Sequence, residues 1–180
     1  MDTMTITEGL AELKTIGKRI EKKRAAIQTY LVRPAVVKDP LAAQGGSAAY
    51  VKQEMQSIYD LLTRFATIRH AVQSKNLGTQ LTIEGLTRTV QGWLNWRKEI
   101  APIYTKHLQQ IRANIDAVRN QTHRQQGRVL KEDAQDANQT DVLINLDEVV
   151  LNQDLERIET ILGTLDGKLS LLNATTTIEV

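Results

Sequence analysis

The side chains best suited to chemistry in this sequence are neighbouring carboxylates and three histidines, His70, His107 and His123. None of the histidines has a second His, Asp or Glu at the spacing of a known metal-binding motif. His107 falls seven residues after Ile100, which predicts a place at the edge of an apolar helix face. The carboxylate pairs at 132–133 and 147–148 are adjacent, so they project in different directions and are expected in caps or loops. These residues do not indicate acid–base catalysis or a metal centre.

Motifs that contain a catalytic nucleophile or bind phosphate are also missing from the sequence. The chain has no cysteine, which excludes a disulfide framework, a thiolate metal site and a cysteine nucleophile. It has no Gly-x-Ser-x-Gly motif and no dinucleotide fingerprint, and Gly45-Gly46 is not followed by the Lys-Ser or Lys-Thr of a phosphate loop. We therefore expect a protein without enzymatic activity, cofactor or metal.

Charge is distributed unevenly although the formal net charge is only +2. Residues 14–24 are basic, residues 141–180 are acidic, and a candidate basic patch comprises Arg112, Arg119, Arg124, Arg128 and Lys131. No aromatic side chains interleave the basic runs to stack on bases, so nucleic-acid binding is the weaker interpretation. The pattern favours pairing between helices of opposite charge, within one chain or between chains.

Two further features could serve partner binding. Trp93 and Trp96 lie three residues apart, so at least one is expected in the core, and the other is a candidate anchor for a partner. Gly163 and Gly167 form a Gly-x-x-x-Gly spacing, which lets a neighbouring helix or a bulky side chain approach closely.

Hydrophobic periodicity predicts helices at about 7–31, 48–78, 86–122 and 148–172. Thr5 and Glu8 have the spacing of a capping box, and Thr82 is a candidate N-cap for the third helix. Pro102 should kink that helix near 99–102 or divide it into two abutting helices. Loops are expected at about 32–47 and 121–141.

The last helix has the most regular apolar seam, at Leu151, Leu155, Ile158, Leu162, Leu165, Leu169 and Leu172. A brief strand is expected before it at 142–146. The β-prone C-terminal tail is expected to pair with that strand or with a neighbouring chain.

The predicted fold class is therefore all-α: a single domain over 1–180, with about four long helices in an antiparallel coiled-coil-like bundle. No run of about 18 apolar residues predicts a membrane span, and the N-terminus lacks a signal-peptide pattern. We expect the protein in a virion or in the cytoplasm.

Two stretches, IRHAVQSKNLGTQLTIEGLTRTVQGWLNWRKEI (68–100) and VLINLDEVVLNQDLERIETILGTLDGKLSLLNATTTIEV (142–180), resemble the septicolysin-like family of small helical bacterial and phage proteins. The shared pattern is a helix, an Asn-containing turn and a following helix start, and then a short β segment, a capped leucine helix and an Asn-x-Thr-Thr ending. The resemblance implies a membrane-active or pore-forming alternative. The acidic polar face of the last helix argues against membrane binding.

The function we expect from the residues is that of a non-enzymatic structural or adaptor protein, assembling as a homo-oligomer or with other structural proteins. A phage head, neck or tail component is its most concrete form. The alternatives are the membrane-active protein that the resemblance implies and a nucleic-acid-binding helical protein.

Overall fold

The computed structural model describes residues 3–129 and 143–180, with side chains of 125–129 outside the description. The elements in chain order are β1 (Thr3–Thr5), α1 (Ile6–Tyr30), the 3₁₀ turn η1 (Ala42–Gln44), α2 (Ser47–Gly78), β2 (Gln80–Ile83), β3 (Leu86–Thr89), α3 (Val90–Asn95), the π-helical segment η2 (Trp96–Ile100), α4 (Ala101–Val129), α5 (Glu148–Thr175) and β4 (Thr177–Glu179). The predicted mostly helical fold is confirmed, with small two-stranded sheets added.

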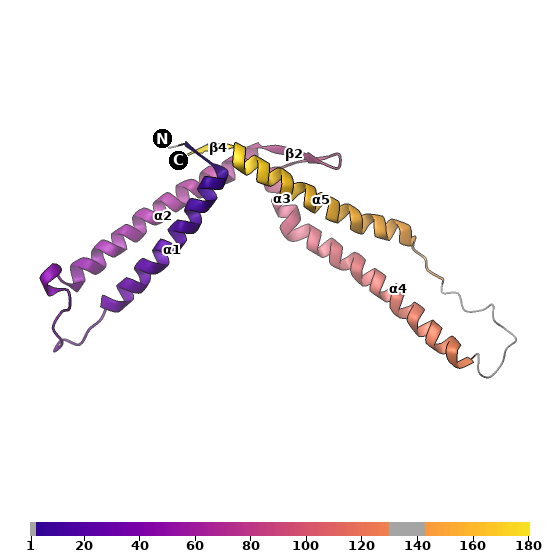
Figure 1. The fold of residues 1–180 in the computed structure, drawn as a ribbon, viewed down its shortest axis with the longest axis horizontal. Helices are drawn as coiled ribbons and strands as arrows, with labels where there is room; N and C mark the ends of the chain where they lie inside the picture. The colour runs from indigo at the N-terminus through magenta and orange to yellow at the C-terminus, as the bar shows by residue number, and fades with distance from the viewer. Residues whose placement is uncertain (1–2, 130–142) are drawn as a thin grey trace. The chain divides into compact units, whose positions relative to one another are not determined.

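The chain divides into two compact units: Met1–Gln80 with Lys168–Val180, and Leu81–Gly167. In the first unit α1 and α2 form an antiparallel hairpin (Figure 1). Two ion pairs cross it, from Lys23 Nζ to Glu54 Oε2 at 3.0 Å and from Arg64 Nε to Glu12 Oε1 at 2.9 Å. Because α1 positions rise along the chain as their α2 partners fall, these pairs fix an antiparallel register.

The two ends of the chain meet in a small sheet, where N and C lie together in Figure 1. β1 and β4 pair antiparallel, with Met4 opposite Ile178. The expected capping box is present: the Glu8 N–H donates to Thr5 Oγ1, and the Thr5 N–H donates to Glu8 Oε2 at 2.7 Å. The Thr5 hydroxyl also donates to Glu8 Oε2, at 2.9 Å. The two bonds that Thr5 donates to this carboxylate, first from its backbone N–H and then from its hydroxyl, lower the pKa of Glu8. The sheet thus joins directly to the start of α1.

The core of this unit gathers where the sheet covers the base of the helical hairpin. Its buried members come from α1, α2 and β4: Ile6, Leu13, Ile16, Ile68, Val72 and Ile178. Gly9 lies against them, since a Cβ there would stand 3.1 Å from Ile178 Cδ1 and 3.3 Å from Ile68 Cγ2. The absence of a side chain at Gly9 lets α1 approach both neighbours.

The second unit begins with a β-hairpin that the sequence interpretation did not predict. The two-residue turn at Glu84 and Gly85 has positive φ at both positions, 49° and 74°, as the turn between twisted antiparallel strands requires. The proposed N-cap at Thr82 is therefore wrong: Thr82 lies in β2, and Thr89 caps the helix by accepting from the Gly92 N–H. The predicted helix start at 86 is also wrong, because β3 occupies 86–89.

The interruption expected near Pro102 is a change of helix type. η2 lies between α3 and α4, and the Ala101 N–H bonds to the Trp96 carbonyl five residues back. A π-helical turn inserts one extra residue into the helical ladder. Pro102 directly follows this π-helical turn within a continuous helix, and the break in the regular hydrogen-bond ladder is the place where its missing N–H is accommodated.

α4 and α5 run antiparallel in this unit (Figure 1). The loop predicted at about 121–141 is wrong over 121–129, because α4 continues to Val129. The rest of that prediction, 130–141, lies outside the described residues. The strand expected at 142–146 is absent over 143–147, the part that the structure describes. The C-terminal strand pairs instead with β1.

Candidate interaction surfaces

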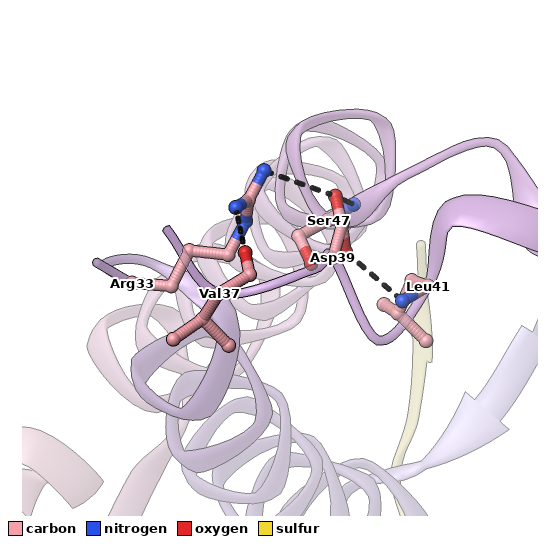
Figure 2. A network of polar contacts seen from close by, with 5 residues as sticks. All are labelled: Arg33, Val37, Asp39, Leu41 and Ser47. Atoms are coloured by element: carbon pink, nitrogen blue, oxygen red, sulfur yellow. Dashed lines mark hydrogen bonds and ion pairs between the residues drawn. The ribbon is translucent and has the colours of Figure 1, made fainter. Parts of the chain in front are cut away.

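A polar network closes the tip of the α1–α2 hairpin around Asp39 (Figure 2). Gly46, the N-cap of α2, has φ 90° and no side chain to satisfy the first turn. Asp39 supplies that acceptor: its Oδ2 accepts from the Ser47 N–H at 2.9 Å, and its Oδ1 accepts from the Leu41 N–H at 2.9 Å. The Ser47 hydroxyl and backbone, and then Leu41, hold the pKa of Asp39 at about 2.

Arg33 completes this tip. Its Nη1 donates to the Val37 carbonyl at 2.6 Å, and its Nη2 lies 3.9 Å from Asp39 Oδ2. The loop backbone is thus tied to the start of α2, while the side chains of Val32 and Val36 remain 81% and 95% exposed. The network orders the loop and leaves its aliphatic side chains on the surface.

The leucine seam of α5 is largely buried. Leu151, Ile158, Leu165 and Leu169 are buried, whereas Leu155, Leu162 and Leu172 are partly buried. Ile161, which the predicted seam omitted, is also buried. Its place three residues after Ile158 and four before Leu165 is the helical spacing that could have identified it.

Both tryptophans lie in the interior of the second unit. Trp93 is fully buried and Trp96 is 9% exposed, and their rings meet edge to face at 5.6 Å between centroids. Trp93 Nε1 donates to the Leu81 carbonyl at 2.9 Å, and the Arg88 guanidinium lies over the Trp93 ring. The candidate role of an exposed partner anchor is therefore corrected: the Trp93 indole joins the β-hairpin to α3, and Trp96 packs against it.

Polar contacts tie α5 to α4 and η2. Arg97 Nη1 lies 2.6 Å from Asp166 Oδ1, and Arg119 makes a two-pronged contact with Glu148. Between them, the Tyr104 hydroxyl donates to Asp154 at 3.1 Å, and this bond raises the pKa of Tyr104. The contacts follow an antiparallel register and orient the two helices.

The candidate basic patch does not form one surface among the described side chains. Arg119 is engaged by Glu148, and Arg112 lines a hollow that it shares with Asp116. Arg124 follows Arg119 by five residues, which turns it well away around the helix. The Arg128 side chain and Lys131 lie outside the described residues.

That hollow is an open space of about 550 Å³ between α4 and α5. Its α4 wall includes Arg112 and Asp116, and its α5 wall includes Leu155, Glu156 and Glu159. Acidic side chains therefore outnumber basic ones around a partly buried leucine.

The Gly163 and Gly167 spacing lies further along α5. Both positions are exposed, and a Cβ at either would meet nothing within 4 Å. The close neighbour predicted for these glycines is not present among the described residues.

Each helical unit leaves apolar side chains exposed at helical spacing. On α2 we define an outer seam by its exposed members, Ala48, Met55, Tyr59, Leu62 and Ala66. On η2 and α4, Ile100, Ile103, Tyr104 and Val118 are between 42% and 72% exposed. Contiguous apolar exposure of this kind is typical of surfaces that bind other proteins.

The histidines are exposed, and His107 follows Ile103 and Tyr104 by four and three residues, which places it beside these exposed apolar side chains on α4. Among the described residues, no three His, Cys, Asp or Glu side chains are placed to hold a metal ion. Within the same part of the chain, no helix has the length and apolar character to cross a bilayer.

No protein-family model, curated protein or solved structure matches this chain. The similarity to the septicolysin-like family therefore depends only on the two segments quoted above.

Proposed function

We propose that this protein is a non-enzymatic structural protein that assembles with further copies of itself through its helical hairpins. The observation that supports the proposal most directly is the outer seam of α2. Its members follow spacings of seven, four, three and four residues, the pattern by which one helix packs against another.

In a helical hairpin each helix packs against its partner on one side, so its other side stays accessible to a further helix. The buried side of α2 faces α1, as Ile68 and Val72 show, while Tyr59 in the outer seam is 57% exposed. A further helix packed there would remove Met55, Tyr59 and Leu62 from water. Full burial of an exposed side chain of this size contributes about 1.5–3 kcal/mol, and these side chains are 42–57% exposed, so burying the remainder of one contributes about half of that before the cost of association.

The assembly is tested by the mass of the protein in solution. We expect light scattering and sedimentation at micromolar concentration to give a particle heavier than the 20.2 kDa chain. The double variant Met55→Glu/Leu62→Glu should shift the particle toward the monomer with unchanged helix content. A matched control is Val149→Glu/Leu171→Glu, because these side chains are 62% and 68% exposed and lie on α5, not on α2.

A compact monomer at all accessible concentrations would refute the proposal. A component of a phage virion is the concrete setting that we propose for such an assembly. Mass spectrometry of purified particles encoded by the same genome tests that setting, and absence of the chain from the particles would exclude it.

A further inference from the structure

One face of α1 presents a row of lysines to solvent. Leu10, Lys14, Lys18 and Lys22 follow one another at intervals of four residues, so consecutive members lie about 6 Å apart on one side of the helix. All four are exposed, and the row turns by about 40° at each step, from Leu10 beside the buried face to Lys22 on the side of α1 opposite the buried Leu13. The three lysines have no ion-pair partner among the described residues.

This row differs from the other cations of the same helix. Lys23 is engaged with Glu54 across the hairpin, and Arg24 lies 3.9 Å from Glu21. Arg19 is also exposed and has no ion-pair partner in the described part of the chain, but it follows Lys18 directly and so projects away from the row. Lys14, Lys18 and Lys22 are thus the cations along the row whose charge the hairpin itself does not neutralise.

The second unit holds a surface of opposite sign. The hollow between α4 and α5 is lined by Asp116, Glu156 and Glu159 together with Leu155, and Arg112 is the cation of the lining. The acids have no ion-pair partner among the described residues, whereas Glu148 and Asp166 on α5 are engaged by arginines. The lining of the hollow thus combines three carboxylates with the apolar side chains of Ala113 and Leu155.

We propose that the Leu10–Lys14–Lys18–Lys22 row of one copy binds the acidic hollow between α4 and α5 of a second copy. The inference rests on the proposed assembly and specifies one of its contacts. Each lysine stem can cover apolar surface while its ammonium group reaches a carboxylate. Leu10, 39% exposed, supplies an aliphatic group that can meet Leu155.

The sequence charges of the two units support this choice of occupant. The unit formed by residues 1–80 and 168–180 has thirteen Lys and Arg against eight Asp and Glu, and the unit of residues 81–167 has ten against thirteen. Complementary potentials speed encounter and fix the orientation of partners. A nucleic acid could contact the lysine row, but the row has no aromatic side chains to stack on bases. Nucleic-acid binding would also leave the acidic hollow without a partner.

A contact between two different surfaces has consequences for assembly. Such a contact is heterologous, so it can close into a ring or continue through more copies. Since its ion pairs lie at the surface, salt should weaken it. We expect the association constant to fall at least tenfold between 50 mM and 500 mM NaCl.

Charge reversal in trans tests the contact. Lys18→Glu/Lys22→Glu should lower association at least tenfold, and Glu156→Lys/Glu159→Lys should do the same. Mixing the two variants should restore association in sedimentation, because each supplies the surface that the other has lost. Lys52→Glu/Lys75→Glu is the control, since it changes the net charge equally on exposed positions of α2. Circular dichroism checks that every variant keeps its helix content.

The outcomes separate the contact from the assembly. If the wild type assembles and neither reversal weakens it, or the mixture is no better than either variant, the contact is wrong and the assembly stands. A monomeric wild type overturns both. Loss of DNA retention in Lys18→Glu/Lys22→Glu with unchanged self-association would assign the row to nucleic acid and overturn the contact.

Discussion

Two glycines of α1 provide a sharp test of the packing at the base of the first hairpin. Gly9 and Gly17 lie in the same helix, and alanine at either position should gain about 1 kcal/mol of helix propensity. A Cβ at Gly17 meets nothing within 4 Å, so Gly17→Ala should stabilise the protein by about that amount. In a protein of this length, about 1 kcal/mol raises the melting temperature by roughly 2–4 °C.

Gly9→Ala should behave differently because its Cβ would press on two buried isoleucines. The distances of 3.1 Å to Ile178 Cδ1 and 3.3 Å to Ile68 Cγ2 require both side chains to shift. Overpacking costs typically about 1–3 kcal/mol, which offsets or exceeds the gain in propensity. The expected net effect lies between neutral and about 2 kcal/mol destabilising.

Urea denaturation followed by circular dichroism measures both variants, and Gly9→Val with Gly17→Val extends the comparison. We expect Gly9→Val to be the least stable of the four and Gly17→Val to stay close to the wild type. If Gly9→Ala stabilised as much as Gly17→Ala, the close packing of α1 against β4 and α2 would be refuted.

Two further predictions concern the leucine seam of α5 and the loop that contains Asp39. Leu165→Ala, at a fully buried position, should lower the free energy of unfolding by about 2–5 kcal/mol in urea denaturation. Leu171→Ala, at a position 68% exposed, should change it by less than about 0.5 kcal/mol. Similar losses in the two variants would contradict the assigned orientation of α5. Because the pKa of Asp39 is lowered from 3.8 to about 2, its contribution to stability is complete above 3.8 and lost as the pH falls toward 2. Asp39→Asn should therefore flatten the dependence of melting temperature on pH in this range, and an unchanged slope would show that the network contributes nothing.

The helices could be predicted because each has strong local signals. The Thr5–Glu8 capping box and the apolar period after it identified α1, and Gly78 ends α2 within the predicted boundary. Such signals depend on residues within a few turns of one another, which a sequence displays directly. The single domain over 1–180 stays a prediction.

The strands could not be predicted in the same way. The β2–β3 turn places Glu84 at positive φ, where Asn or Asp is the usual signal, so the hairpin resembled the start of a helix. The pairing of β1 with β4 joins the two ends of the chain, and no local pattern in either segment identifies the other as its partner. β-strand pairing depends on distant residues, so local pattern could suggest a strand at the tail but not its neighbour.

The candidate surfaces were only partly visible in the sequence. Val51, Met55, Ile58, Leu62 and Phe65 belong to one apolar period, yet the structure leaves Met55 and Leu62 exposed while the other three are partly buried. The apolar arc of α2 is wider than α1 and the rest of the described unit can cover. Periodicity gives the width of such an arc, and only the fold shows which part of it remains free.

Contacts through the outer seam of α2 and contacts through the lysine row of α1 would respond differently to added salt. Apolar burial at Met55, Tyr59 and Leu62 does not depend on screening and selects poorly among partners. The contacts of Lys14, Lys18 and Lys22 are screened by salt but reject partners of like charge. An assembly held mainly by the seam should therefore persist in 500 mM NaCl while losing its charge selectivity, so charge-reversed and wild-type chains should mix freely there. An assembly held mainly by the lysine row should dissociate under the same conditions, which makes a salt titration of mixed chains the measurement that ranks the two surfaces.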